Sequence, residues 1–519
     1  MGISVVRPAV ALLTTLLLVW AGCSAQPAPT EPPPVTTPTS AVIVTPTALP
    51  TVTPPLNTIP ALTIAPRPTS AIRLTPLPAS PLTLTPVRRP TPGSANIAAA
   101  TAPPVATSAT IPKPSVAPTR PSEPAGRSRA SDPRLARAVQ VVSDSLAVSR
   151  GLSFRDTVKP QLVTRGEMAA YIRSAIKSEE QEELAKTQEL YWLLGLLRPS
   201  VELYPLYLDL LGEQVAGLFD LDTEDLLVVA GALPLDALSK ITLAHELTHA
   251  LQQQRFDART LVEASEVNQD RALAMLALLE GDATLSSVVY ITTNLDLMEI
   301  LALGAEGASG ATPVYDKAPP VIQKTLLFPY EAGLGFVTAL RQGRGVWRPV
   351  NEAYGRPPVS TEQILHPARY LAGEAPKKVA LPPVLPLLTG DWELLLEDVM
   401  GEFILRTYLE SGVAKPAAAR AASGWGGDQF RLLRDSAGGR IFVMLHQWDT
   451  GNDAQEFFDV YEGFTDSTAT WAAKDAVGNS VRWDAEGRSV VLVLDQDRTL
   501  VGIAPDPETA DLVATLIHK

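Results

Sequence analysis

Residues 236–254 read DALSKITLAHELTHALQQQ, and this stretch determines what kind of fold surrounds it. Apolar residues recur at three- and four-residue spacing from Leu238 to Leu251, which is the periodicity of a helix with a buried face. Asp236 is a favourable N-cap residue at the start of this pattern. The sequence therefore predicts a helix that begins after Asp236.

This helix contains the sequence HELTH at residues 245–249. His245 and His249 are four residues apart, so they lie on one helical face and their ring nitrogens can reach one metal ion at about 2.0–2.1 Å. Glu246 is then placed to take a proton from a water molecule near that ion. The alternative is a helix whose histidines only line a core.

A catalytic metal site needs a third protein ligand and an open position. Residues 269–290, QDRALAMLALLEGDATLSSVVY, predict a second apolar helix, in which Glu280 shares a stripe with leucine and alanine side chains. A lone carboxylate on a buried stripe is costly unless another charge compensates it, and a metal ion would do so. Alternative third ligands are Glu263, Glu266 and Asp257, which lie in a less apolar context.

The HELTH sequence and its apolar flanks resemble the zincin metallopeptidases, and the LLEGDA sequence at residues 278–283 is similar to the third-ligand helix of the gluzincin branch. The residues around Glu280 differ from the thermolysin-like pattern Asn-Glu-x-x-Ser-Asp. The resemblance extends over about residues 213–290 and more weakly to 370. It implies a zinc peptidase that hydrolyses peptide or protein substrates and binds one Zn²⁺ per chain through His245, His249 and Glu280, with Glu246 as the base. Two imidazoles and one carboxylate suit zinc better than magnesium or calcium.

Four further residues are candidates for supporting roles. Asp282 or Asp270 could accept a hydrogen bond from a ligating histidine, although the sequence favours a solvated acid on a helix face for each. Tyr330, in LLFPYEAGLGFVTAL (326–340), and His366, in RPPVSTEQILHPARY (356–370), could stabilise the oxyanion of a tetrahedral intermediate. His366 precedes a proline and is equally consistent with the end of a helix.

The segments EQVAGLFD (213–220) and LLVVAG (226–231) predict a hairpin joined by the acidic turn LDTED. In zincins a strand at the sheet edge runs along the cleft, and VAGLFD (215–220) lies at the corresponding place in this sequence. Such a strand can bind an extended peptide through main-chain hydrogen bonds. An ordinary structural hairpin is the alternative.

The N-terminal 23 residues have the order of a secretory signal: Arg7, an apolar run from Ala9 to Trp20, and two small residues before Cys23. Cys23, the one cysteine in the chain, is in the position of the lipidated cysteine of a bacterial lipoprotein, although Trp20 stands where leucine is usual. We therefore expect a membrane lipid anchor on the extracytoplasmic face. An ordinary signal peptide with a chance cysteine is the alternative.

Residues 24–130 hold 26 of the 47 prolines, mostly in repeated Thr-Pro and Ala-Pro pairs. A segment of this composition cannot form a hydrophobic core, so it predicts a disordered linker. The net charge of −13 comprises +1 in residues 1–23, +6 in the linker and −20 in residues 131–519. An acidic folded part argues against nucleic acid as a partner, because binding phosphates needs a basic face.

The sequence of the folded part predicts an α+β protein. We expect a mostly helical zincin-like domain at 131–390 and a small α+β domain of unknown role at 391–519. Residues 132–199 predict helices, and WELLLEDVMGEFILRTYLESG (392–412) predicts one amphipathic helix. After a turn at residues 424–427, strands are expected at 429–435, 440–448, 480–483, 489–495 and 499–504, with helices at 453–464 and 507–517. His446 and His518 are expected to be structural or solvated.

Two other functions are compatible with these patterns. A surface lipoprotein could retain the zincin-like scaffold for binding or for a structural metal without catalysis. A metal-dependent hydrolase could also act on another amide, such as a cell-wall peptide.

Overall fold

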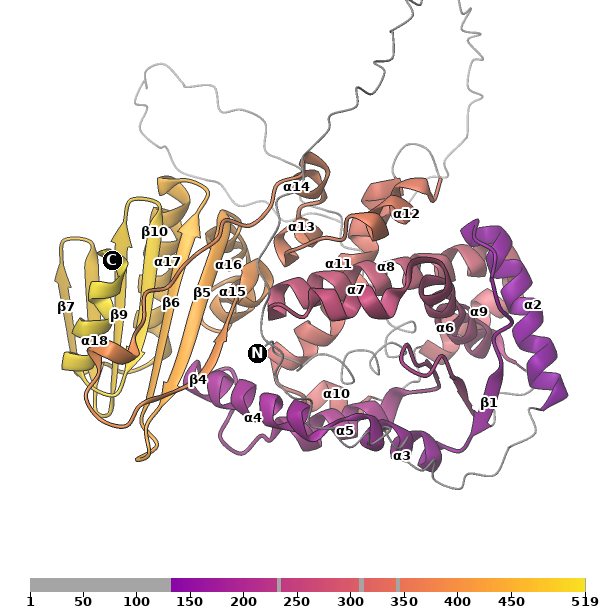
Figure 1. Cartoon of the computed structure of the whole chain (residues 1–519), viewed down its shortest axis with the longest axis horizontal. Helices are drawn as coiled ribbons and strands as arrows, with labels where there is room; N and C mark the ends of the chain where they lie inside the picture. The colour runs from indigo at the N-terminus through magenta and orange to yellow at the C-terminus, as the bar shows by residue number, and fades with distance from the viewer. Residues whose placement is uncertain (1–131, 231–234, 308–311, 342–345, 519) are drawn as a thin grey trace, which may run out of the picture. The chain divides into compact units, whose positions relative to one another are not determined.

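The computed structural model describes residues 132–230, 235–307, 312–341 and 346–518 (Figure 1). The predicted signal segment, Cys23 and the linker lie outside these described residues. The folded part is α+β, as predicted, with two sheets and a set of helices.

Most of the first half of the described chain is helical. The helices there are α2 (Pro133–Arg150), α3 (Arg165–Ala175), α4 (Ser178–Leu193), α5 (Leu203–Gln214), α6 (Ala237–Phe256), α7 (Ala258–Ser265), α8 (Gln269–Asn294), α9 (Leu297–Gly307), α10 (Pro313–Lys317), α11 (Pro320–Arg341), α12 (Arg348–Gly355), α13 (Thr361–Leu365) and α14 (Pro367–Ala372). Helix α6 begins where the sequence predicts, because the Asp236 side chain accepts a hydrogen bond from the Ser239 N–H at 2.7 Å.

Helix α8 is the central helix of this region. It is long and apolar enough to cross a membrane by length and composition, but 78% of its apolar window is buried inside the protein, which is typical of a core helix. It packs against α11 at Gly281 and Gly333, where a Cβ atom on either glycine would overlap the backbone of the other helix. The missing Cβ atoms therefore allow the two backbones to approach closely.

A three-stranded sheet lies beside α6 (Figure 1). Its strands are β1 (Pro160–Val163), β2 (Gly217–Phe219) and β3 (Leu226–Val229), in the order β1-β3-β2, with β1 parallel and β2 antiparallel to β3. The hairpin is confirmed, and β2 is an edge strand. Strand β1 was not predicted, because it has four residues and no clear alternation.

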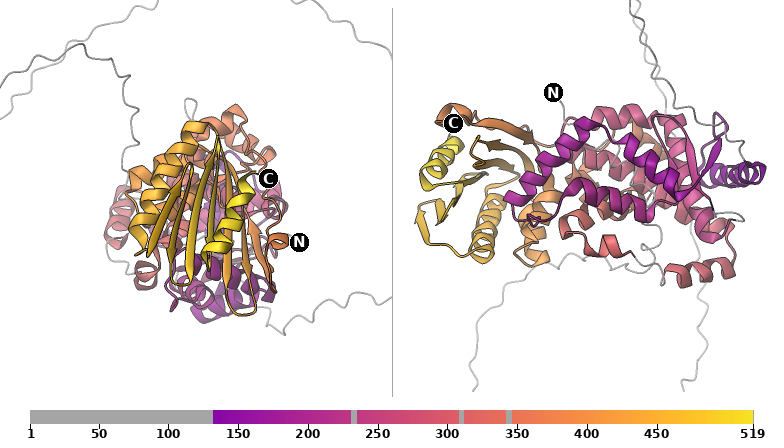
Figure 2. Two further views of the ribbon diagram at one scale, coloured as in Figure 1. Left: turned by 90° about the vertical axis from the view of Figure 1, so that its left-hand side faces the viewer. Right: turned by 90° about the horizontal axis from the view of Figure 1, so that it is seen from below.

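The C-terminal part is a seven-stranded antiparallel sheet in the order β4-β5-β6-β10-β9-β8-β7 (Figure 2). The strands are β4 (Glu393–Asp398), β5 (Trp425–Arg434), β6 (Arg440–Trp448), β7 (Ala473–Val477), β8 (Ser480–Ala485), β9 (Arg488–Asp495) and β10 (Arg498–Ala504). The remaining helices are α15 (Gly401–Leu409), α16 (Lys415–Ala422), α17 (Gly451–Thr468) and α18 (Pro507–Ala514), with short 3-10 turns at Leu385–Leu387 and Thr515–His518.

Alternating side chains of this sheet pack against different helices. On β6, Phe442 and Met444 join the cluster that contains Phe457 of α17, whereas Ile441 and Val443 join the cluster that contains the residues of α18. Because successive side chains of a strand point to opposite faces, α17 and α18 cover opposite faces of the sheet. The strands predicted at 440–448, 480–483, 489–495 and 499–504 are confirmed within a residue or two at their ends.

Two predictions of local structure are wrong, and a second strand besides β1 was not predicted. Residues 392–412 form strand β4 and then α15, because pairing of β4 with β5 overrides the helical pattern and Gly401, at φ 73°, interrupts it. The expected turn at 424–427 is instead the start of β5, which pairs with β6 through a bulge. Strand β7 was also missed, because its five side chains are all exposed and carry no hydrophobic signal.

Candidate functional site

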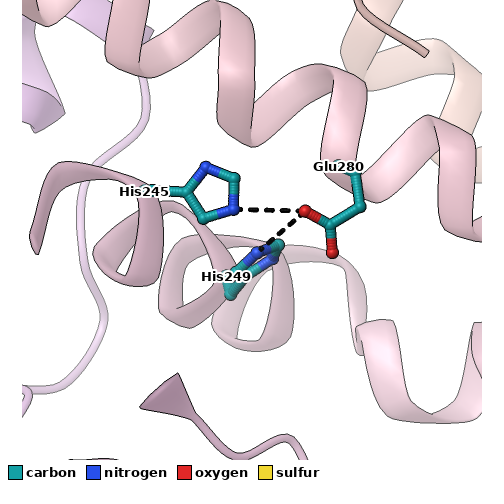
Figure 3. A group of neighbouring side chains, drawn as sticks. All are labelled: His245, His249 and Glu280. Carbon is teal, nitrogen blue, oxygen red and sulfur yellow. Dashed lines mark hydrogen bonds and ion pairs between the residues drawn. The ribbon is translucent and has the colours of Figure 1, made fainter. Parts of the chain in front are cut away.

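The three predicted metal ligands meet in the core, between α6 and α8 (Figure 3). The Nε2 atoms of His245 and His249 lie 3.1 Å and 3.7 Å from the same Oε2 atom of Glu280. One ligand atom from each residue lies within 4.8 Å of the others, and the three residues are at most 3% exposed. The two histidines come from consecutive turns of α6, as their spacing requires.

Unsatisfied polar atoms at this cluster fit a cation. The Nε2 atom of His249 and the Oε1 atom of Glu280 are buried without a hydrogen-bond partner among the described residues. Buried polar atoms are rarely left in this state, and such atoms often mark an ion or water site. Two imidazole nitrogens and one carboxylate form a common ligand set for catalytic zinc, which leaves a fourth position open. The residues present therefore fit a zinc ion.

The charges of the cluster are coupled. Burial raises the pKa of Glu280, but the neighbouring His249 and His245 outweigh this effect and the pKa is lowered overall. Burial lowers the pKa of His249, but the carboxylates of Glu280 and Glu246 outweigh it and raise this pKa to about 9. At neutral pH the metal-free cluster is thus a buried pair of imidazolium and carboxylate. A metal cation would replace the proton on His249.

Gln252 orients the second histidine. The Nδ1 atom of His249 lies 2.8 Å from Oε1 of Gln252, so an Nδ1–H donates to the amide oxygen and Nε2 is left to face Glu280. The amide nitrogen of Gln252 donates to the Leu279 carbonyl at 2.9 Å and to Asp282 Oδ2 at 3.3 Å. Sequence reasoning missed Gln252, although its position three residues after His249 on the same helix was a usable signal.

Asp282 does not contact a histidine as predicted, because Gln252 lies between Asp282 and His249. It contacts Gln252 rather than a histidine, and it forms a fully buried ion pair with Arg150, with Nε–Oδ1 and Nη2–Oδ2 distances of 2.8 Å and 3.1 Å. The Tyr354 hydroxyl also donates to Asp282 Oδ2 at 2.7 Å. Asp282 therefore ties α2, α8 and α12 together behind the cluster.

Glu246 is held by the edge strand. Its Oε2 atom accepts a hydrogen bond from the Phe219 backbone N–H of β2 at 2.7 Å, and its side chain is 1% exposed. A cavity of about 280 Å³ lies beside it, lined by Glu246 and Thr242 of α6, by Gly217 of β2 and by apolar residues of β3. Glu246 thus lies in the wall of this cavity, and the residue before it on α6 is the predicted ligand His245.

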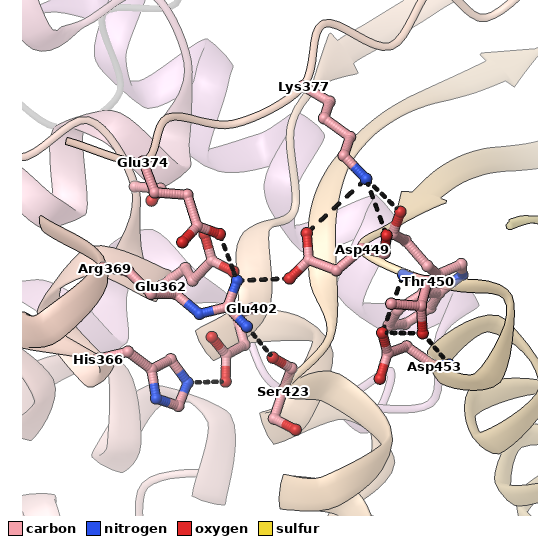
Figure 4. Close-up of polar contacts among 12 residues, drawn as sticks. Glu362, His366, Arg369, Glu374, Lys377, Glu402, Ser423, Asp449, Thr450 and Asp453 are labelled. Atoms are coloured by element: carbon pink, nitrogen blue, oxygen red, sulfur yellow. Dashed lines mark hydrogen bonds and ion pairs between the residues drawn. The ribbon is translucent and has the colours of Figure 1, made fainter. Parts of the chain in front are cut away.

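Of the two proposed oxyanion residues, one lies at the cluster. The Tyr330 ring of α11 is buried and stacks near His245, with ring centroids 6.2 Å apart. The prediction for His366 is not supported by its position, because its Nε2 atom lies 2.9 Å from Glu402 Oε1 at the start of α15. Pro367 begins α14 and turns the chain there, so the imidazole points to α15 (Figure 4).

The remaining candidates lie outside the cluster. Asp270 lies in the first turn of α8, whereas Asp282 lies near its middle. Asp270 accepts hydrogen bonds from the backbone N–H and the hydroxyl of Thr361, and no described contact joins it to a histidine. The group of ligand atoms contains Glu280 and none of the three alternative acids, Asp257, Glu263 and Glu266. Asp257 instead caps α7 through Thr260.

A second group of acids is organised around an arginine. Glu362, Glu374 and Asp449 have oxygen atoms close enough to hold an ion, but the Nη1 atom of Arg369 lies 2.8 Å, 2.6 Å and 2.5 Å from them (Figure 4). The guanidinium supplies the positive charge that these acids need. This group therefore connects α13 and α14 to the end of β6 and is structural.

Comparisons with known proteins leave the metal cluster unassigned. A family model described as a domain of unknown function, DUF8575, matches residues 393–514, which hold the seven-stranded sheet and begin close to the predicted domain boundary at 391. No curated protein matches the sequence. A crystal structure of a candidate hydrolase with a novel fold, from Chloroflexus aurantiacus, is 18% identical, covers 48% of this chain and 92% of that chain, and has a TM-score of 0.32.

Proposed function

We propose that this chain is an exported zinc metallopeptidase that is anchored to the membrane through Cys23. The convergence of His245, His249 and Glu280 carries the proposal, because the buried Nε2 atoms of both histidines face one carboxylate oxygen. In addition, His249 Nε2 and Glu280 Oε1 have no hydrogen-bond partner among the described residues. A zinc ion bound there supplies Lewis-acid activation of water and of a peptide carbonyl.

The chain's own residues supply the proton transfers. Glu246 takes the proton of the attacking water and passes it to the leaving amine. The Phe219 N–H bond holds the Glu246 carboxylate at β2, so the base is already oriented before substrate arrives. The Tyr330 ring lies beside His245, and we assign to its hydroxyl the hydrogen bond to the developing oxyanion.

The cavity beside Glu246 provides a place for the substrate. Strand β2 pairs only with β3 among the described strands, but the Phe219 N–H on its other edge already donates to Glu246, so α6 rather than a peptide covers this edge. The 280 Å³ cavity would accept one side chain of the peptide.

Replacing Glu246 by glutamine tests this function. The variant keeps the size of the side chain and its hydrogen bond to Phe219, but it removes the base. We expect it to retain zinc and to lose peptide hydrolysis by at least about a hundredfold, as measured on a mixture of unstructured peptides by mass spectrometry. Glu224→Gln, at an exposed turn, is the matched control. Hydrolysis by Glu246→Gln at the rate of the control would rule out the mechanism.

The membrane anchor is tested separately. A Cys23→Ser chain, expressed in a bacterium, is expected to leave the membrane fraction. Persistence of this variant in the membrane, with its signal segment removed, would contradict lipidation at Cys23.

A further inference from the structure

A second cavity is lined by none of the metal ligands, and its wall holds more basic than acidic residues. It has a volume of about 570 Å³, which is in the range of small-molecule sites. The turn between α4 and α5, the turn between α10 and α11, and the end of α15 form its walls. None of the predicted or observed site residues lines it.

The charged residues of this cavity are mostly basic. Arg198, Lys317 and Lys324 line it, and Glu410 is the one acid among its lining residues. Residues 131–519 carry a net charge of −20, so a basic cavity stands out against the rest of the folded part. A local excess of positive charge attracts anions and selects against cations.

Glu410 is already neutralised by neighbours. Its carboxylate lies 2.6 Å from Lys324 Nζ and 2.9 Å from Arg406 Nε, and its side chain is only 6% exposed. The side chains of Arg198 and Lys317 are exposed at the cavity and form no hydrogen bond or ion pair with another described residue. Two positive charges are therefore available to a ligand.

The backbone and the apolar wall add to this selectivity. Helix α11, with 22 residues, begins at the cavity with Pro320 and has no acidic residue in its first turn. The positive end of its dipole thus faces the same space as the lysines. Leu196, Leu197 and Val321 are buried and form an apolar surface in the wall.

We propose that this cavity binds a small organic anion that combines a phosphate or carboxylate group with an apolar body. Arg198 and Lys317 pair with the anionic group, and the apolar body packs against Leu196, Leu197 and Val321. The site is independent of the proposed peptidase function, because it shares no residue with the metal cluster.

Three probes separate the contributions of charge and apolar contact in the purified full-length protein. Phenyl phosphate carries both, inorganic phosphate carries charge alone, and phenol carries the ring alone. We expect phenyl phosphate to bind most tightly in calorimetric titrations. Binding of phenol as tight as that of phenyl phosphate would contradict an anion site.

Two variants locate the binding. Arg198→Ala/Lys317→Ala removes the two unpaired charges, and we expect it to weaken phenyl phosphate binding by about tenfold. Ser200→Trp fills the cavity at an exposed lining residue without a change of charge, and it should block binding. The matched control is Arg137→Ala/Lys415→Ala, which removes two exposed cations outside the cavity.

The outcomes are distinct. Loss of binding in both cavity variants, with the control unchanged, supports the site. Equal weakening in the cavity and control charge variants would show a general effect of net charge and overturn the proposal. Binding that survives Ser200→Trp, or no binding of phenyl phosphate to the wild-type protein at millimolar concentration, would overturn it as well.

Discussion

Gly281 of α8 and Gly333 of α11 face each other so closely that neither position has room for a Cβ atom. A Cβ on Gly281 would overlap the carbonyl of Gly333, and a Cβ on Gly333 would overlap the carbonyl of Ala277. Glu280 is the residue before Gly281, and Tyr330 lies one turn before Gly333. This glycine contact therefore sets the distance between the helices that carry these two site residues.

Alanine at Gly333 is expected to destabilise the protein. The new methyl group meets backbone rather than a movable side chain, so α8 and α11 must separate, at a cost of about 1–3 kcal/mol or more in the free energy of unfolding. Gly335→Ala, two residues along the same helix, has nothing within 4 Å and should be neutral or slightly stabilising. Urea denaturation of the two variants measures the difference, and similar stabilities would disprove the close contact.

Removal of the Gln252 amide should weaken metal binding. Without its acceptor, the His249 ring loses the hydrogen bond that fixes its tautomer, and we expect Gln252→Ala to lower zinc affinity by about 10- to 100-fold. Gln253→Ala is the matched control, because the neighbouring glutamine bonds to Glu224 and Arg259 on the surface. Competition with a chromophoric chelator gives both affinities. An unchanged affinity for Gln252→Ala would exclude the positioning role.

Breaking the buried ion pair should cost more stability than breaking an exposed one. Asp282→Asn leaves Arg150 charged and buried without its partner, with an expected loss of about 3–5 kcal/mol. Glu352→Gln breaks the exposed pair with Arg348 and should cost less than about 1 kcal/mol. Thermal unfolding of the two variants compares them. Equal losses would show that Arg150 finds another partner or reaches water.

Zinc affinity should increase with pH. The pKa of His249 in the metal-free protein is about 9, so below that pH the imidazole holds a proton that zinc must displace. We therefore expect the apparent affinity to rise by up to about tenfold per pH unit between pH 6.5 and 8.5 and to level off above pH 9. Measurements with a chelator of known pH dependence test this, and an affinity independent of pH would contradict a protonated His249.

The ligand set could be predicted from the sequence because it depends on local periodicity. The spacing of His245 and His249 fixes their common face within one helix, and the apolar stripe around Glu280 marks that carboxylate as one that needs compensation. The same argument from helical spacing could also have identified Gln252, three residues after His249. In each case the relevant contacts arise within a helix or between the two helices that the pattern defines.

Other features could not be predicted, since they depend on tertiary contacts. Arg150 is 132 residues from Asp282, and nothing in its own helix indicates that it is buried. The direction of the His366 side chain depends on where α15 packs, and the start of α15 follows a strand, β4, that pairs with the distant β5. Residue type and periodicity do not carry this information.

The most direct test of the central claim is the zinc content of the purified full-length protein and of Glu280→Ala, measured by mass spectrometry. The proposed site predicts about one zinc per chain in the wild-type protein, strong loss in Glu280→Ala, and full retention in Glu263→Ala, which removes a carboxylate outside the cluster. Absence of zinc from the wild-type protein after incubation with the metal, or the same zinc content in Glu280→Ala as in the wild type, would contradict it.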